Sequence, residues 1–404
     1  MLIIFLVVAI DLIGFGMIIP LLPFYAEYFE ASPAVVGLLM ATYSFTQFLA
    51  APSWGRLSDR IGRRPVLLVS LAGTALAYIW LGFAESLLTL FAARAASGAM
   101  AGNISAAFAY MADITTPANR AKGMGLIGAA FGLGFIAGPA IGGILAGSDP
   151  VNADFQTPAF AAAGLSSLAL ILALARLKES LSPEIRANAA SNLPGKKRGK
   201  FIATLRRPRV GLMIFLIFLV TFVFAGMEAT FAMWSRRQFG WGPEQNGYLF
   251  AFIGLLSAMI QGGLIGRLAQ RFGEARLIRQ GAVALACGIA LIPFSDGLPM
   301  LLTAMLILAY GFSIVMPSLN SLISLQVGEE EQGEILGITR SASILARVVG
   351  PAWAGLLFFI LGKDWPFFGG ALVMTVAIYL SLRLSESKTA TPDGDSAKPP
   401  DSDS

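Results

Sequence analysis

Residues 55–64 read GRLSDRIGRR and lie between two long apolar segments. A related stretch, GRLAQRFGEA, begins at Gly266, which is 211 residues later. A Gly-Pro pair at positions 138–139 recurs at positions 350–351, an offset of 212 residues. Because two independent matches share nearly the same offset, the sequence predicts two structural repeats within one chain.

Long apolar stretches surround these motifs on both sides. Each is long enough to cross a lipid bilayer, and helices are the default there because lipid cannot satisfy free backbone groups. We interpret the first stretch as a retained helix, not as a cleaved signal peptide. The sequence therefore predicts an all-α membrane protein with twelve transmembrane helices in two six-helix pseudo-repeats. The expected spans are 2–24, 34–54, 65–83, 87–112, 122–147, 158–178, 209–234, 244–265, 277–294, 298–327, 334–361 and 366–383.

The composition excludes most soluble functions. Hydrophobic residues make up 56% of the 404 residues and charged residues only 13%, which is about half of the usual charged share. The chain has no histidine, which removes His-based triads, HExxH zinc sites and imidazole proton relays. The single cysteine, Cys287, cannot form an intramolecular disulfide or a thiolate cluster. We therefore expect no enzyme, no catalytic residue, no metal, no cofactor and no nucleic-acid partner.

The distribution of positive charge predicts the orientation. Segments on one side of the predicted spans hold 23 of the 29 lysines and arginines, and those on the other side hold three. By the positive-inside rule, the basic side and both termini are cytoplasmic. We expect an N-terminal bundle over 1–178, a cytoplasmic linker over 179–208, a C-terminal bundle over 209–384 and a disordered tail over 385–404.

Five charged residues lie inside the spans, where charge is costly and is usually paired or functional. Asp11 lies near the middle of the first span and Glu228 lies in the outer half of the seventh. A buried carboxyl can bind and release protons near neutral pH. We therefore expect both to border a central cavity and to carry protons, with Arg94 controlling their protonation. A permanent ion pair with Arg94 or Arg347 is the structural alternative, and Arg340 is more typical of a snorkelling residue.

Several polar residues within the spans are candidates for lining the same cavity. Two of them, on the second span, are four residues apart and therefore share one helix face. Hydrogen bonding between helices, without a role in binding, is the alternative for each. The expected cavity residues are Tyr43, Gln47, Asn103, Gln261, Asn320 and Arg347.

These motifs resemble those of the major facilitator superfamily, and within it the twelve-helix drug:proton antiporters with their tetracycline-efflux relatives. The loop at 55–64 is similar to the complete loop signature of the superfamily. The fifth span resembles the antiporter branch, with glycines ahead of a GPxxGG sequence at 138–143. Arg94 followed by Gly98, and AlaAspIleThr at 112–115, strengthen the likeness. The resemblance spans residues 1–384.

The loop signature is expected to act as a conformational latch. Its two glycines permit a tight loop between two helix ends, and Asp59 can accept hydrogen bonds from exposed amides at a helix start. The arginines can pair with acids across the interface between the halves. The alternative is that these arginines only obey the positive-inside rule. The expected latch residues are Gly55, Asp59, Arg60, Gly62, Arg63, Arg64 and Asp113.

The glycines of the fifth span predict close helix contact, and its proline can bend the helix. The resemblance to antiporters implies that this motif serves exchange and not uptake. The expected motif residues are Gly134, Gly138, Pro139, Gly142 and Gly143. The sequence departs from the tetracycline exporters, which resemble one another in a histidine on helix eight and an acid on helix nine. Recognition of a tetracycline–metal complex is therefore not expected.

The resemblance implies a secondary active transporter that exports an amphipathic organic compound by alternating access. Protons from outside would load Asp11 or Glu228. We expect a monomer in a bacterial inner membrane, with a small organic substrate and protons as its partners. One alternative is uptake of a metabolite or organic anion, since three arginines outnumber two carboxyls within the spans. The other is a membrane sensor that transports nothing.

Overall fold

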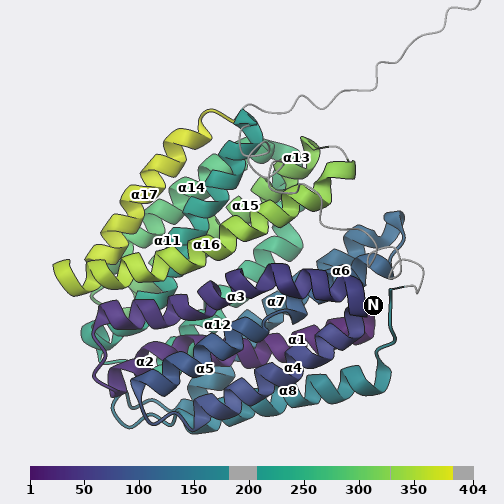
Figure 1. Ribbon diagram of the computed structural model, residues 1–404. Coiled ribbons are helices and arrows are strands. Elements are labelled where there is room, and N and C mark those ends of the chain that lie inside the picture. The colour runs from purple at the N-terminus through teal and green to yellow at the C-terminus, as the bar shows by residue number, and fades with distance from the viewer. Residues whose placement is uncertain (182–206, 328, 385–404) are drawn as a thin grey trace, which may run out of the picture.

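The computed structural model describes residues 1–181, 207–327 and 329–384. All regular elements within these ranges are helices, which form two groups (Figure 1). The first group contains α1 (Leu2–Ile18), η1 (Ile19–Leu21), α2 (Leu22–Tyr28), α3 (Pro33–Ile61), α4 (Arg63–Gly82), α5 (Leu87–Met100), α6 (Asn103–Asp113), α7 (Pro117–Ala146) and α8 (Gln156–Arg176). The second contains α11 (Pro208–Phe239), α12 (Pro243–Met259), η2 (Ile260–Leu264), α13 (Ile265–Phe272), α14 (Glu274–Leu291), η3 (Ile292–Phe294), α15 (Leu298–Leu325), α16 (Glu329–Leu361) and α17 (Trp365–Ser381).

The predicted all-α membrane fold is confirmed. Ten helical segments within the described ranges are long and apolar enough to cross a membrane, and α17 is a shorter apolar helix. Several of the helices begin with proline in the first turn, where the missing N–H costs nothing and the fixed φ suits the helix. The expected tail at 385–404 and most of the expected linker, residues 182–206, lie outside the described residues.

The fourth predicted span is not one continuous helix, contrary to the expectation for 87–112. It is divided into α5 and α6 at Ala101 and Gly102. Gly102 lies against the indole ring of Trp54 on α3, so a side chain at this position would clash with the ring. The indole N–H of Trp54 also donates to the carbonyl of Ala99 at 2.6 Å. Close contact with α3 therefore accompanies the break.

The two repeats are visible in the backbone as well as in the sequence. Gly62 ends α3 with φ of 112°, and Gly273 ends α13 with φ of 76°. These positive values favour glycine, and the two positions are 211 residues apart. One helix of each repeat packs between a helix of its own repeat and a helix of the other. These are α7, between α1 and α12, and α16, between α11 and α3. The repeat predicted from the loop motifs therefore has matching turns and matching packing.

The two groups of helices touch at one end and diverge toward the other. We call the end with the α3–α4, α6–α7 and α13–α14 connections the basic end, and the other the closed end (Figure 1). Near the closed end, Gly143 meets the Cα of Gly247, and Gly37 meets the Cα of Gly355. Toward the basic end, a side chain added at Gly125, Gly128 or Gly132 of α7 would meet no other element within 4 Å. The interior is therefore open toward the basic end.

Candidate functional site

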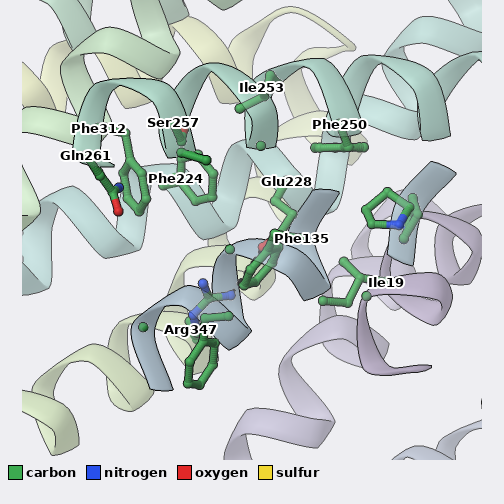
Figure 2. Close-up of a pocket in the computed structure, with 18 residues that line it drawn as sticks. Ile19, Phe135, Phe224, Glu228, Phe250, Ile253, Ser257, Gln261, Phe312 and Arg347 are labelled. Atoms are coloured by element: carbon green, nitrogen blue, oxygen red, sulfur yellow. Dashed lines mark hydrogen bonds and ion pairs between the residues drawn. The ribbon is translucent and has the colours of Figure 1, made fainter. Parts of the chain in front are cut away.

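A cavity of about 230 Å³ lies between the two groups of helices. Figure 2 shows its labelled side chains coming from several helices toward one space. Phenylalanines dominate the lining, and the rings of Phe224 and Phe312 stack with centroids 4.0 Å apart. The lining residues are Gly16, Ile19, Pro20, Gly128, Phe131, Gly132, Phe135, Pro139, Phe224, Glu228, Phe250, Ile253, Gly254, Ser257, Ala258, Gln261, Phe312 and Arg347. A pocket of this kind suits an apolar or aromatic ligand with a few polar groups.

An ion pair forms the charged part of the cavity wall. Arg347 Nη1 on α16 lies 3.2 Å from Glu228 Oε2 on α11. The side chain of Glu228 is 7% exposed, whereas that of Arg347 is 31% exposed. The carboxylate is therefore mostly withdrawn from solvent while the guanidinium remains accessible. Such a pair inside a membrane span is a candidate functional site.

Gln261 reaches the cavity from a local irregularity in its helix. It lies in η2, a single π-helical segment at Ile260–Leu264, where the N–H of Ile265 donates to the carbonyl of Ile260. Two glycines, Gly262 and Gly263, follow it. Segments of this type occur often at functional sites because they change the direction of a side chain. Gln261 and Arg347 are the two expected cavity residues that line this cavity.

Asp11 lies outside the lining of this cavity, which corrects its expected position. Its carboxylate accepts hydrogen bonds from Asn103 Nδ2 at 2.5 Å and from Ser166 Oγ at 2.7 Å. The backbone N–H of Asn103 donates to Ser70 Oγ at 2.8 Å. This network joins α1, α4, α6 and α8 beside the break in the fourth span. Asp11 therefore faces the interior of the first helix group, while Gly16 on the same helix lines the cavity.

Arg94 is a buried cation beside an aromatic ring. Its guanidinium carbon lies 4.7 Å from the ring centre of Tyr43, and the residue is 2% exposed. Among the described residues, its Nε and Nη1 atoms have no hydrogen-bond partner. Tyr43 and Gln47 on α3 and the exposed Asn320 on α15 lie outside the cavity lining. Arg340 is partly buried, and its guanidinium carbon lies 4.9 Å from the ring centre of Phe108 in the other helix group.

The glycine motif of α7 packs against helices of both groups. Gly138 and Gly134 lie against the backbone of α1, at Gly16 and Leu12, and Gly142 lies against Met17. On another face, Gly143 contacts Pro243 and Gly247 of α12. The carbonyl of Pro139 lies where a side chain on Gly247 would be. The motif therefore allows α7 to pack closely on its own group and on the opposite one.

The expected latch residues form a cluster within the first helix group. Arg63 Nη1 lies 2.5 Å from Asp59 Oδ1, and Arg63 Nε lies 3.1 Å from Asp113 Oδ2. The backbone N–H groups of Arg63 and Arg64 donate to the carboxylate of Glu179 at 2.9 and 3.1 Å. These partners lie in the first helix group and not across the interface between the halves, and Arg60 is exposed. This cluster joins the ends of α3, α4, α6 and α8 at the basic end.

Comparison with known proteins identifies the family. A family model described as the Major Facilitator Superfamily matches residues 4–351, with a further match at 264–402. The chain belongs to this superfamily. The tetracycline resistance protein of class C from Escherichia coli is 33% identical over 382 residues, which cover 92% of each chain. Multidrug resistance protein 2 of Bacillus subtilis (strain 168) is 30% identical, covering 93% of this chain and 92% of the relative.

Two solved structures share the same fold. The human organic anion transporter MFSD10 (TETRAN) aligns with a TM-score of 0.72 and 27% identity, covering 94% of this chain and 98% of that one. A bacterial homologue of the human lysosomal transporter Spinster aligns with a TM-score of 0.77 and 13% identity, covering 94% and 95%. This chain is therefore a multi-pass membrane protein of a transporter superfamily.

An ion-pair cluster at the closed end of this superfamily member was not predicted from the sequence. Glu27 on α2 binds Arg236 Nη1 through Oε2 and Arg237 Nη1 through Oε1, each at 2.9 Å. The side chain of Glu27 is 9% exposed. We call these three residues the closed-end clamp. Two features of the sequence could have suggested this cluster. Glu27 is a carboxylate just beyond the first span, and Arg236 and Arg237 are two of the three basic residues on the sparsely charged side.

The clamp should hold the two helix groups together at the closed end. Glu27→Gln would remove both ion pairs. We expect it to increase the population of molecules opened at this end about tenfold, which corresponds to a loss of about 1.4 kcal/mol in the free energy that favours the closed state. A hydrogen bond to a charged group contributes at least that much. Spin labels on exposed loop positions Asn152 and Asp296, in a Cys287→Ser background, would measure the separation.

Glu244→Gln is a matched control for the clamp. Glu244 lies at the same end, but its carboxylate accepts a hydrogen bond from Tyr248 Oη on its own helix, at 3.0 Å. We expect this variant to keep the wild-type distance distribution. An unchanged distribution in Glu27→Gln, or an equal change in both variants, would contradict the role of the clamp.

Proposed function

We propose that the chain is a proton-coupled antiporter that exports an amphipathic organic compound by alternating access. The Glu228–Arg347 ion pair in the wall of a phenylalanine-rich cavity carries the proposal. The aromatic rings would hold the apolar part of a substrate, and the charged pair would bind a polar part. The tetracycline and multidrug resistance proteins among the relatives support a substrate of this class.

The loop charges support an orientation. With 23 of 29 basic residues on one side, the positive-inside rule favours a cytoplasmic basic end, with both termini in the cytoplasm. In that orientation the cavity is accessible from the cytoplasm and the closed-end clamp faces outward. The state described is then the one that loads an exported substrate. A monomer suffices, because both walls of the cavity come from one chain.

Competition between a proton and Arg347 for the Glu228 carboxylate would couple proton movement to substrate movement. An ionised Glu228 pairs with Arg347, whereas a protonated Glu228 releases it, because the proton removes the attraction between them. A proton arriving from outside would neutralise the carboxylate and permit the return to the cytoplasm-facing state. Asp11 would carry a second protonation event within the first helix group, where its network meets the break between α5 and α6. Arg94 would regulate that event through its buried positive charge.

The basic-end latch would stabilise the opposite conformation. As the two helix groups approach at this end, Arg60 and the Asp59–Arg63 pair would meet the second repeat of the same loop motif at 266–275. The α7 glycines would keep the closed-end contact tight in the present state. Each half, 1–178 and 209–384, would move as one bundle, joined by the linker at 179–208.

Transport of an organic anion is the second candidate function. Arg94 is a buried cation that lacks a described carboxylate partner, and the guanidinium of Arg347 is accessible from the cavity. The guanidinium of Arg347 could hold an anion directly while Arg94 adds positive charge from outside the cavity lining, and the solved relative MFSD10 is described as an organic anion transporter. This protein would then act as an uptake symporter or a facilitator. A sensor without transport would show no flux of any compound.

Vesicle flux measurements distinguish these functions. Purified protein in proteoliposomes would be given ethidium as a cationic probe and fluorescein as an anionic one. Export by antiport predicts that ethidium accumulates in the compartment that is more acidic, and only while the pH gradient lasts. Movement of fluorescein together with protons would support the uptake alternative, and absence of flux for both probes and for tetracycline would contradict both transport proposals.

A further inference from the structure

A second cavity, of about 600 Å³, lies on the side of the molecule. We call it the side cavity; its walls come from α3, α11 and α16, and they include Pro52, Phe215 and Ser341. The lining is apolar apart from the hydroxyl of Ser341 and backbone groups. It is separate from the central cavity, whose lining residues it does not share. In Figure 1, α3 and α16 diverge in front of α11 toward the basic end.

The side cavity lies near the basic end and opens outward. On α11 its lining begins at Gly211, three residues after the helix starts, and ends at Phe218. Seven residues of helix rise about 10 Å, which is about a third of the hydrocarbon core. Leu49 and Phe215 in its lining are 60% and 47% exposed. The side cavity therefore faces the acyl chains of one leaflet.

Positive charge lies beside the side cavity at the basic end. Pro52 lines the cavity on α3, and Arg56 follows it by four residues, so the two lie one turn apart on the same side of the helix. The Nε atom of Arg56 donates to the carbonyl of Pro52 at 3.2 Å, which holds the guanidinium next to the lining. Within the described ranges, no carboxylate forms an ion pair with Arg56 or Arg60.

We propose that the side cavity binds one acyl chain of an anionic phospholipid, with Arg56 holding the headgroup. The apolar walls match the chain, and the exposed guanidinium lies where the chain ends and the headgroup begins. Asp59, the nearest acid in the sequence, is already paired with Arg63, so the net charge at this point of α3 is positive. A bound chain would lie between α3 and α16, where the two helix groups diverge, and would therefore stabilise the present state over one closed at the basic end.

Native mass spectrometry tests the lipid site directly. The full chain in detergent would be offered equal amounts of phosphatidylglycerol and phosphatidylcholine with the same acyl chains. We expect the wild type to retain phosphatidylglycerol about fivefold better, the effect of one basic residue on an anionic lipid. Arg56→Gln should remove this preference, and Ser341→Trp, which fills the cavity, should reduce retention of both lipids. Ala342→Leu is a milder filling variant if the tryptophan prevents folding.

Matched controls separate this site from the general lipid coat. Leu372→Trp adds the same side chain to a position on α17 that is 69% exposed, and Arg176→Gln removes an exposed arginine at the end of α8. Both should retain lipid as the wild type does. Unchanged retention in Ser341→Trp and Ala342→Leu, or an unchanged preference in Arg56→Gln, would overturn the proposal. Displacement of phosphatidylglycerol by ethidium, one for one, would also overturn it and assign the cavity to substrate.

Discussion

Glu228→Gln is expected to abolish proton-driven transport while substrate exchange without a gradient continues. The substitution keeps the shape of the side chain but removes the group that alternates between a proton and Arg347. Because Glu228 lies in the cavity wall at 3.2 Å from Arg347, its loss uncouples the proton from the substrate. The ligand would then cross the membrane only down its own gradient.

The size of the effect follows from the driving force. One pH unit supplies about 1.36 kcal/mol per proton, so each proton moved per substrate supports about tenfold accumulation across one unit. With a gradient of two units, the wild type should accumulate ethidium about a hundredfold in proteoliposomes if Glu228 alone carries a proton, and more if Asp11 carries a second one. Glu228→Gln should reach equal concentrations on both sides. A time course of ethidium fluorescence, with a collapse of the pH gradient at the end, measures both plateaus.

Partner variants show whether folding or coupling is lost. Glu228→Gln leaves the partly exposed Arg347 without its acid, which should destabilise the protein by less than the several kcal/mol of a fully buried unpaired charge. The double variant Glu228→Gln/Arg347→Gln removes both charges and should unfold at a temperature close to that of the wild type. It should still lack proton-driven accumulation. Full accumulation in either variant would contradict the role of Glu228.

Much of the architecture could be predicted from the sequence, because membrane folds are constrained by length and charge. The helix ends at Gly62 and Gly273 lie in the repeated loop motif, whose offset of 211 residues is evident in the sequence alone. Glu228 and Arg347 were predictable as candidate functional residues, because a charge within a membrane span is costly and is usually paired or functional. The close packing of the α7 glycines likewise follows from their spacing.

Features that depend on which face of a helix meets which neighbour could not be predicted. Asp11 was expected in the central cavity because its depth matches, yet its carboxylate turns toward Asn103 and Ser166. The break at Gly102 depends on the Trp54 ring from another helix. The closed-end clamp joins residues about 209 positions apart, a pairing that periodicity within one helix cannot specify.

Asp11→Asn is the second substitution expected to abolish proton-driven transport, although this residue does not touch the central cavity. Asparagine fits the network, since its Oδ1 can accept from Asn103 Nδ2 and its Nδ2 can donate to Ser166 Oγ. The variant should therefore fold, with a loss of about 1 kcal/mol or less. It should bind ethidium as the wild type does but fail to accumulate it against its gradient, because the site no longer takes up a proton.

Ser166→Ala distinguishes a proton carrier from a structural carboxyl. It removes one hydrogen bond to Asp11 but leaves the ionisable group in place. If Asp11 carries a proton, Ser166→Ala should retain gradient-driven accumulation with a shifted pH dependence, whereas Asp11→Asn should lose it at every pH. If the network only clamps α1 to α6 and α8, both variants should lower the unfolding temperature and both should keep the full plateau. That second pattern would leave Glu228 as the sole proton carrier of the proposed cycle.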